Sequence, residues 1–271
     1  MSSACDNCPS KQGCTSQDSC PSLKGPQKDP GIKRVIGIAS GKGGVGKSFV
    51  TAMLAVSLSR KGYKVGVLDA DVTGPSIPRA FGLSGRLTAT DDNRLVPVTT
   101  AGGIKAVSLN LLMEDEKTPV IWRGPVISGV VKQFWTETDW GMLDVLLIDM
   151  PPGTGDVPLT VFQSIPVDGI ILVSTPQDLV SMIVSKARNM AAAMHIDVLG
   201  LVENMSYVKC PHCDEKIPLF GDDHALADFD IIDKLPLDPS VTALVDSGKT
   251  EEADTSMLDN TASLIEALIK A

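Results

Sequence analysis

Short apolar segments alternate with longer stretches of helical periodicity from about residue 33 to the end of the chain. Five segments of four to six residues are rich in Val, Ile and Leu and have the pattern of buried strands. They span residues 35–39, 65–68, 145–148, 169–174 and 198–202. Buried strands that alternate with helices are typical of a parallel sheet covered on both faces. The pattern predicts an α/β fold, doubly wound around a mainly parallel sheet.

The spacing of apolar residues also predicts helices and minor strands. One helix is expected over residues 48–61, with Gly62 at its C-cap, and another over residues 179–194. The apolar residues that share one face of the first helix are Val50, Met53, Leu54 and Leu58. Residues 94–98 and 104–109 are expected to form shorter strands, arranged as a hairpin at the edge of the sheet.

The first 32 residues have a different composition. Ser, Gln, Lys, Asp, Gly, Pro and Cys dominate them, and Leu23 is the one aliphatic residue larger than alanine between Met1 and Ile32. Such a segment cannot bury a core, so a ligand, a metal or a partner would be needed to order it. We therefore expect a cysteine-rich extension and linker over residues 1–32 and one large domain over residues 33–271.

The overall charge argues against two classes of partner. The 271 residues carry a formal net charge of −9 at pH 7, whereas nonspecific binding to DNA or to an anionic membrane needs a basic face. No apolar run approaches the roughly 18 residues of a membrane span, and the first residues lack the apolar region of a signal peptide. We expect a cytoplasmic protein that binds neither nucleic acid nor membrane.

Residues 41–48 match the phosphate-binding pattern G-x-x-x-x-G-K-[ST] between a predicted strand and a predicted helix. The loop consists of Gly41, Lys42, Gly43, Gly44, Val45, Gly46, Lys47 and Ser48. Glycines let the backbone N–H groups turn toward phosphates, and the helix N-terminus favours negative charge. Lys47 is expected to bridge the β- and γ-phosphates, and Ser48 to bind Mg²⁺. The pattern predicts a nucleoside triphosphate site.

Acidic residues follow two of the predicted strands. Asp69 and Asp71 come after residues 65–68, and Asp149 comes after residues 145–148. Ligands of open α/β sheets bind at the edge where the carboxyl ends of the strands meet. A lone aspartate after a strand is more often a cap or a turn residue. The phosphate loop upstream makes a role in the nucleotide site the favoured interpretation here. We therefore expect Asp149 to act on Mg²⁺, directly or through water.

Lys42, inside the loop, resembles the signature lysine of the deviant P-loop class, which includes MinD, ParA, the nitrogenase iron protein and the Mrp/ApbC cluster carriers. Further stretches narrow the resemblance to the Mrp/ApbC family and are spread over most of the chain. They are Leu68-Asp69-Ala70-Asp71 with Gly74-Pro75-Ser76, Trp122-Arg123-Gly124-Pro125, Thr175-Pro176-Gln177 and Val202-Glu203-Asn204-Met205-Ser206. The resemblance implies the P-loop NTPase fold and an iron–sulfur cluster carrier that binds and hydrolyses ATP.

The resemblance also implies roles for single residues. In the deviant class the signature lysine reaches the phosphates bound by the other subunit, so Lys42 implies a homodimer. Asp71 resembles the switch I residue that positions the attacking water, and Asn204 resembles the residue that hydrogen-bonds adenine, which favours ATP over GTP. Without the resemblance, Lys42 would be taken as a solvated loop residue and Asn204 as a turn residue. The catalytic residues it implies are Lys42, Lys47 and Asp71.

Cys210 and Cys213 form a C-x-x-C pair on a short polar insertion near residues 205–221. A [4Fe–4S] cluster or a tetrahedral metal needs four ligands, and one pair supplies two thiolates. A two-fold dimer would bring two pairs together, so that the cluster bridges the subunits. The resemblance agrees, since the family holds a labile cluster at such a motif. A thioredoxin-like redox pair, a zinc half-site with His212 and a pair without function stay open as alternatives.

Four more cysteines crowd the N-terminus, namely Cys5, Cys8, Cys14 and Cys20. Four thiolates so close together suit a complete [4Fe–4S] site within one chain. The eukaryotic cytosolic branch of the family carries an N-terminal motif that ends in C-x2-C-x5-C, which Cys5, Cys8 and Cys14 resemble. The first cysteine of that motif lies farther upstream, and Cys20 is expected to take its place as a ligand. Structural zinc stays open for this group.

Two classes of function account for these features. The first is an ATPase that receives a [4Fe–4S] cluster from a donor and delivers it to apoproteins. The second is a MinD- or ParA-like positioning ATPase with structural zinc at its cysteines. MinD-type membrane attachment uses a basic amphipathic C-terminal helix, whereas residues 257–271 carry one lysine beside Asp259 and Glu266. We predict the carrier, with ATP, Mg²⁺ and the cluster as its ligands, because it explains the clustered cysteines.

Overall fold

The computed structural model describes residues 26, 28–72, 74, 76–113, 124–220 and 229–271. Its main strands are β1 (Ile32–Ser40), β2 (Val65–Asp69), β5 (Val98–Thr99), β6 (Lys105–Val107), β7 (Leu143–Asp149), β8 (Gly169–Ser174), β9 (Val198–Lys209), β10 (Lys216–Pro218) and β11 (Ile231–Pro236). They form one sheet in the order β10-β9-β8-β1-β7-β2-β6-β5, with β11 paired to β9. The pairings of β5 with β6 and of β9 with β10 are antiparallel, and the others are parallel. The predicted mainly parallel sheet is confirmed.

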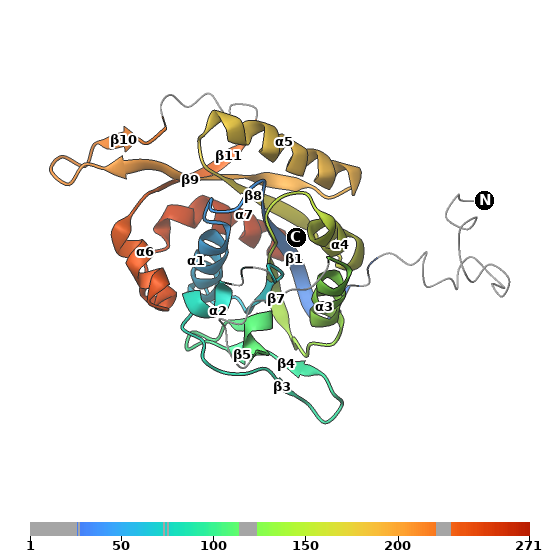
Figure 1. Cartoon of the computed structure of the whole chain (residues 1–271). Helices are drawn as coiled ribbons and strands as arrows, with labels where there is room; N and C mark the ends of the chain where they lie inside the picture. Colours follow the sequence, from blue (N-terminus) through green and yellow to red (C-terminus); the bar gives the residue numbers. More distant parts are fainter. Residues whose placement is uncertain (1–25, 27, 73, 75, 114–123, 221–228) are drawn as a thin grey trace.

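Helices cover both faces of this sheet (Figure 1). They are α1 (Lys47–Arg60), α2 (Ile77–Ala80), α3 (Gly124–Thr136), α4 (Asp156–Ser164), α5 (Asp178–Ala193), α6 (Pro239–Asp246) and α7 (Asp259–Lys270), with the 3-10 helices η4 (Leu109–Leu111), η5 (Thr250–Glu252) and η6 (Ser256–Leu258). Residues of α3, α4 and α5 join one hydrophobic cluster, and residues of α1, α6 and α7 join another. The predicted doubly wound α/β fold is therefore confirmed.

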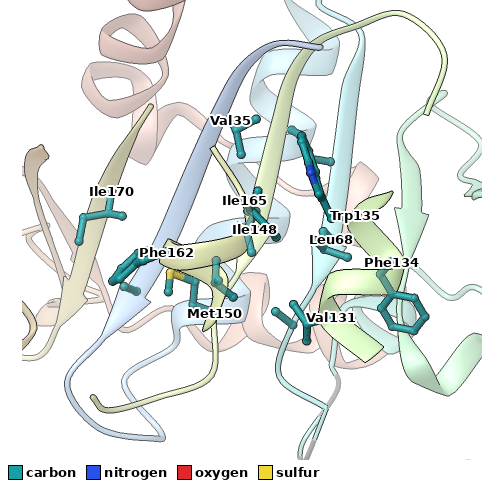
Figure 2. Close-up of a cluster of buried hydrophobic side chains, with 14 of the residues drawn as sticks. Val35, Leu68, Val131, Phe134, Trp135, Ile148, Met150, Phe162, Ile165 and Ile170 are labelled. Atoms are coloured by element: carbon teal, nitrogen blue, oxygen red, sulfur yellow. The ribbon is translucent and has the colours of Figure 1, made fainter. Parts of the chain in front are cut away.

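Each face of the sheet has its own core because successive side chains of a strand point to opposite faces. In β7, Ile148 belongs to the cluster with α3 and α4, whereas Leu147 belongs to the cluster with α1. Figure 2 shows the first cluster, with Trp135 of α3 on one side of Ile148 and Phe162 of α4 on the other. Each such buried side chain contributes roughly 1.5–3 kcal/mol. The two cores hold the strand ends in fixed positions.

Helix α1 differs from the sequence prediction in its burial. One apolar face was expected, but every residue from Val50 to Leu58 is buried. The sheet covers one side of this helix, and α2, α7 and η5 pack against it as well. Since α1 begins at the phosphate loop, this burial fixes the loop to the centre of the protein.

The strand predictions are confirmed near the centre and corrected at the edges. The expected edge hairpin exists between β5 and β6, but residues 94–98 are divided between β5 and β4 (Leu95–Val96), which pairs with β3 (Thr88–Ala89) in a separate sheet. Strand β9 continues beyond Val202 to Lys209, and β11 was not predicted. Within the described part of the chain, every helix is too short or too polar to span a bilayer.

Candidate functional site

The phosphate loop joins the carboxyl end of β1 to the first turn of α1. Gly44 and Gly46 have φ values of 81° and 84°, in the left-handed region that favours glycine. A Cβ atom on Gly46 would lie 2.1 Å from Asn204 Nδ2, so a side chain has no room there. On another side of the loop, the Gly153 N–H donates a hydrogen bond of 2.8 Å to Ser40 O. A glycine loop of this shape at a helix N-terminus is an anion site.

Lys47 bonds to Asp149, the last residue of β7. The distance from Lys47 Nζ to Asp149 Oδ1 is 2.7 Å, and both side chains are buried. Asp149 also accepts hydrogen bonds from Ser48 Oγ at 2.5 Å and from Thr51 Oγ1 at 2.9 Å. A carboxylate beside a hydroxyl is an oxygen donor set that suits Mg²⁺. The structure thus places the two residues predicted to act on Mg²⁺ side by side, and it adds Thr51, which no motif indicated.

The two aspartates at the carboxyl end of β2, Asp69 and Asp71, have different environments. Asp71 lines a cavity beside the phosphate loop, which we call the phosphate cavity, and its Oδ2 lies 4.0 Å from Lys47 Nζ. Asp69 is fully buried and accepts hydrogen bonds from Ser108 Oγ at 3.1 Å and from the Asp71 N–H at 3.2 Å. Burial, followed by the charge of Asp149, raises the pKa of Asp69 to about 8 although Lys47 acts in the opposite direction. Asp69 therefore holds the loop after β2, and Asp71 faces the site.

Two cavities meet at the phosphate loop. The first, the phosphate cavity, has a volume of about 250 Å³ and is lined by the loop together with Asp71 and Pro152. The second, of about 110 Å³, has mainly apolar walls. Gly46 and Phe49 line both cavities, so the two cavities are neighbours. A polar cavity beside an apolar one suits a nucleotide, with the phosphates in the first and the base in the second.

Asn204 lies in the wall between the phosphate loop and the apolar cavity, which we call the base cavity. It is buried, its Nδ2 donates to Val45 O at 2.9 Å, and its Oδ1 accepts from the Met205 N–H at 2.9 Å. The structure therefore places Asn204 in the wall of the apolar cavity. Its hydrogen bond to adenine stays a prediction. A side-chain amide can donate two hydrogen bonds and accept two, so these two backbone bonds do not prevent it.

Lys42 also lines the phosphate cavity, but it does not share the partners of Lys47. Lys42 Nζ donates a hydrogen bond of 2.7 Å to Gln177 Oε1, and the contact is partly buried. The two lysines of the loop thus have separate acceptors, a carboxylate for Lys47 and a neutral amide for Lys42.

Cys210 and Cys213 lie at the turn of the β9–β10 hairpin, which projects from the body of the protein (Figure 1). The Cys210 N–H donates to Glu215 O at 2.9 Å, and the Asp214 N–H donates to Cys210 O at 3.0 Å. Cys213 is exposed and Cys210 is half-buried, and hydrogen bonds, above all from the His212 N–H, lower the pKa of the Cys210 thiol. A thioredoxin-like pair would lie at the start of a helix, whereas this pair lies in a hairpin turn.

The predicted metal ligands are placed only in part. Cys5, Cys8, Cys14 and Cys20 lie outside the described residues. Among the residues that are described, no three or more His, Cys, Asp or Glu side chains are grouped to hold a metal ion. The hairpin pair of one chain therefore offers two thiolates, and a four-ligand cluster needs further ligands from elsewhere.

The base cavity contains residues that the sequence did not indicate. Besides Asn204 and Met205, its walls include Phe49 of α1, residues 236–238 at the end of β11, Val241 of α6 and Met257 of η6. Phe49 directly follows the phosphate loop, so the sequence could have indicated that it lies near the site. The other segments carry no motif and are brought together by the fold.

The phosphate loop, the carboxylates beside it and the parallel sheet define a P-loop NTPase. Comparison with family models gives the same class, since residues 31–270 match the ParA model described as NUBPL iron-transfer P-loop NTPase. The chain belongs to this family of iron-transfer P-loop NTPases. The family predicted from the sequence motifs is therefore confirmed.

Known proteins resemble the chain over most of its length. The iron–sulfur cluster carrier protein of Clostridium perfringens is 48% identical, over 92% of this chain and 94% of that protein. The cytosolic Fe–S cluster assembly factor CFD1 of Kluyveromyces lactis is 41% identical, over 82% of each. A nucleotide-binding protein of Archaeoglobus fulgidus, solved in complex with ADP, is 45% identical, with a TM-score of 0.72 over 82% of this chain and 89% of that one.

The fold is also shared with more distant proteins. MinD of Pyrococcus horikoshii, solved with Mg-ADP, has a TM-score of 0.60 over 87% of this chain and 95% of its own, at 20% identity. At that identity the likeness concerns the fold.

Proposed function

We propose that this chain is a cytoplasmic ATPase that carries a [4Fe–4S] cluster between two copies of itself and transfers it to apoproteins. The observation that carries the proposal is the course of β9. This strand contributes Asn204 to the base cavity and ends at Lys209, one residue before Cys210. One continuous strand therefore connects the nucleotide site to the thiol pair. The name of the Clostridium relative, an iron–sulfur cluster carrier, supports the cargo.

ATP hydrolysis is the reaction that the residues of the first cavity support. Lys47 would contact the β- and γ-phosphates in place of Asp149, its present partner at 2.7 Å, and Asp71 would orient the attacking water. Asp149 and Ser48 would hold Mg²⁺, which when bound neutralises charge on the phosphate oxygens. Lys42 would act on the phosphates held by the second copy. The ADP in the Archaeoglobus relative supports a nucleotide in this place.

A second copy of the chain would complete the cluster site. Two pairs of Cys210 and Cys213 related by a two-fold axis supply the four thiolates that the cluster requires. Three large apolar side chains that follow the pair are partly exposed. The exposed fraction is 48% for Ile217, 36% for Leu219 and 41% for Phe220. Neighbouring exposed apolar side chains are typical of an interaction surface. Their place beside the pair supports a homodimer that meets at this hairpin.

The remaining partners follow from the cargo. A carrier needs a cluster donor and apoprotein clients, and neither a nucleic acid nor a membrane is part of the proposal. The net charge of −9 supports leaving nucleic acid and anionic membranes out of the proposed partners. The cytosolic assembly factor among the relatives supports a cytoplasmic place. For Cys5, Cys8, Cys14 and Cys20 we propose a second [4Fe–4S] site, with structural zinc as the alternative.

Anaerobic reconstitution with iron and sulfide tests the proposal. In Cys210→Ala/Cys213→Ala, the iron bound at the hairpin should be lost, as seen by absorption near about 400 nm and by Mössbauer spectroscopy. ATP affinity should stay within about twofold of wild type, because neither cysteine lines the cavities.

The matched control removes two thiols from the other group. Cys5→Ala/Cys8→Ala should keep the iron at the hairpin. If the Cys210→Ala/Cys213→Ala variant retains the full iron content of wild type, the cluster does not lie at this pair and the proposal is wrong.

A further inference from the structure

Lys42 and Gln177 meet from two loops at the carboxyl edge of the sheet. Lys42 follows β1, and Gln177 follows β8, which pairs with β1 in parallel. The distance between Lys42 Nζ and Gln177 Oε1 is 2.7 Å. Since Lys42 also lines the phosphate cavity, the contact lies at the wall of that cavity. The ammonium therefore has a fixed position before any phosphate arrives.

The local structure of Gln177 presents its amide to Lys42. Gln177 is the N-cap residue of α5, and its N–H donates to Thr175 O at 2.8 Å. An N-cap side chain usually accepts a hydrogen bond from the first turn of its own helix. The Gln177 side chain makes no such bond. Its amide oxygen instead accepts a hydrogen bond from the lysine of the phosphate loop.

The chemistry of the acceptor matters because Gln177 is uncharged. An amide oxygen accepts a hydrogen bond from the ammonium without neutralising its charge, whereas a carboxylate would form an ion pair. Phosphate oxygens are negatively charged and attract the ammonium more strongly than an amide does. A glutamine can therefore hold the lysine in place and still release it to a nucleotide.

We propose that Gln177 is a positioning residue for Lys42, which holds the ammonium in the nucleotide-free protein and releases it to phosphate oxygens when ATP binds. This inference rests on the proposed function, in which Lys42 acts on phosphates held by the second copy, so that Lys42 is released when the two copies bind ATP together. Gln177 releases the Lys42 ammonium during ATP binding. A stronger bond between the two side chains therefore raises KM and the dissociation constant for ATP and leaves kcat at saturating ATP unchanged.

The test uses the full chain with Gln177→Glu, Lys42→Ala and the double variant, and it measures MgATP binding by calorimetry together with kcat and KM. Gln177→Glu should weaken ATP binding about two- to fivefold, the size of a partly exposed ion pair. Salt at about 0.5 M should remove most of this effect. In the Lys42→Ala background the same substitution should have no effect, because no ammonium remains to be held.

Two further variants complete the design. Gln177→Ala, which adds no charge, should bind ATP at least as tightly as wild type, and weaker binding would contradict the inference even if the glutamate variant fails to fold. Gln133→Glu changes an exposed glutamine of α3 in the same way, and it should leave ATP binding unchanged.

The outcomes separate the inference from the proposed function. A loss of affinity in Gln177→Glu that persists in the double variant would overturn the inference, since it would come from repulsion between the carboxylate and the phosphates. Wild-type affinity in Gln177→Glu would overturn it too. If Lys42→Ala hydrolyses ATP at the wild-type rate, the proposed function fails at Lys42 and the inference falls with it. If Lys42→Ala loses ATP hydrolysis while Gln177→Glu binds ATP as wild type does, the inference is wrong and the proposed function stands.

Discussion

The nucleotide site and the cysteine hairpin share strand β9 but are built in opposite ways. At the nucleotide end, Asp149 is buried and accepts hydrogen bonds from three side chains of α1, those of Lys47, Ser48 and Thr51. At the hairpin, Cys213 is exposed and Cys210 half-buried, in a turn that supplies two thiols. In the first site, the groups around Asp149 are assembled within one chain, whereas the second site holds half of the ligands that a cluster requires.

This difference indicates what each site is suited to do. A buried and fully bonded set of groups binds its ligand in a fixed geometry, as a phosphate site requires. Exposed thiols that two chains would share in the proposed dimer could release their cargo, as a carrier requires. The two sites are also in contact, since the Leu237 N–H donates to Tyr207 O at 2.8 Å. Leu237 lines the base cavity and Tyr207 belongs to the stem of the hairpin.

Removal of Lys47 should disrupt the nucleotide end most strongly. Lys47→Ala deletes the ammonium at the phosphates and leaves Asp149 buried without its charged partner. We expect ATP affinity to fall by at least about 100-fold, as measured by calorimetry, while iron binding at the hairpin is retained. The control, Lys33→Ala, removes an exposed lysine paired with Asp144 at 2.7 Å and should bind ATP as wild type does. Unchanged ATP binding in Lys47→Ala would refute the assignment of the loop.

The glycines of the loop test how tightly the nucleotide end is packed. Alanine at Gly44 or Gly46 must adopt a left-handed conformation, which costs about 1–2 kcal/mol. At Gly46 the new Cβ would also meet Asn204 Nδ2 at 2.1 Å, whereas nothing lies within 4 Å at Gly44. Gly46→Ala should therefore lower the free energy of unfolding by roughly 1–3 kcal/mol more than Gly44→Ala, in urea denaturation without nucleotide. Equal losses would mean that Asn204 moves aside freely.

A smaller effect is expected at Asp238, in the wall of the base cavity. It caps α6 by accepting hydrogen bonds from the Ser240 N–H at 2.8 Å and from Ser240 Oγ at 2.6 Å. Asp238→Ala should lower the free energy of unfolding by about 1 kcal/mol at pH 7. The hydrogen bond from the Ser240 side chain, more than any other cause, lowers the pKa of Asp238 from its usual 3.8. The stabilising effect is therefore present above pH 3.8 and is lost as the pH falls through the lowered pKa.

Urea denaturation of wild type and Asp238→Ala at a series of pH values measures this dependence. The difference between the two proteins should shrink at the acid end, and a difference that stays constant with pH would contradict the account. Asp254 makes similar bonds to Ser256, at 2.9 Å each, but does not line the base cavity. Asp254→Ala should therefore leave ATP affinity unchanged, whereas Asp238→Ala should weaken it slightly.

The sequence predicted the central strands better than the outer ones, for a physical reason. Residues 169–174 match β8 in both bounds because all six are buried and so are uniformly apolar or small. Beyond Val202, β9 includes polar residues such as Ser206 and Lys209, and pairing with β10 and β11 keeps it extended. Burial around α1 was underestimated because α7, one of the elements that cover it, lies at the far end of the chain.

The same distinction applies to the site. The phosphate loop, Asp71 and Asp149 could be placed from local spacing, since each follows a predicted strand. The base cavity could not, because its walls come from segments that are distant in sequence and carry no shared pattern. Gln177 was noticed as part of a family motif, and its contact with Lys42 appears only when β1 and β8 lie side by side.

The stoichiometry of the metallated protein tests the central claim most directly. A variant with serine in place of the N-terminal cysteines, Cys5, Cys8, Cys14 and Cys20, restricts the iron signal to the hairpin. After anaerobic reconstitution, native mass spectrometry should show two chains holding one [4Fe–4S] cluster. A single chain that keeps a whole cluster at Cys210 and Cys213 would contradict the account.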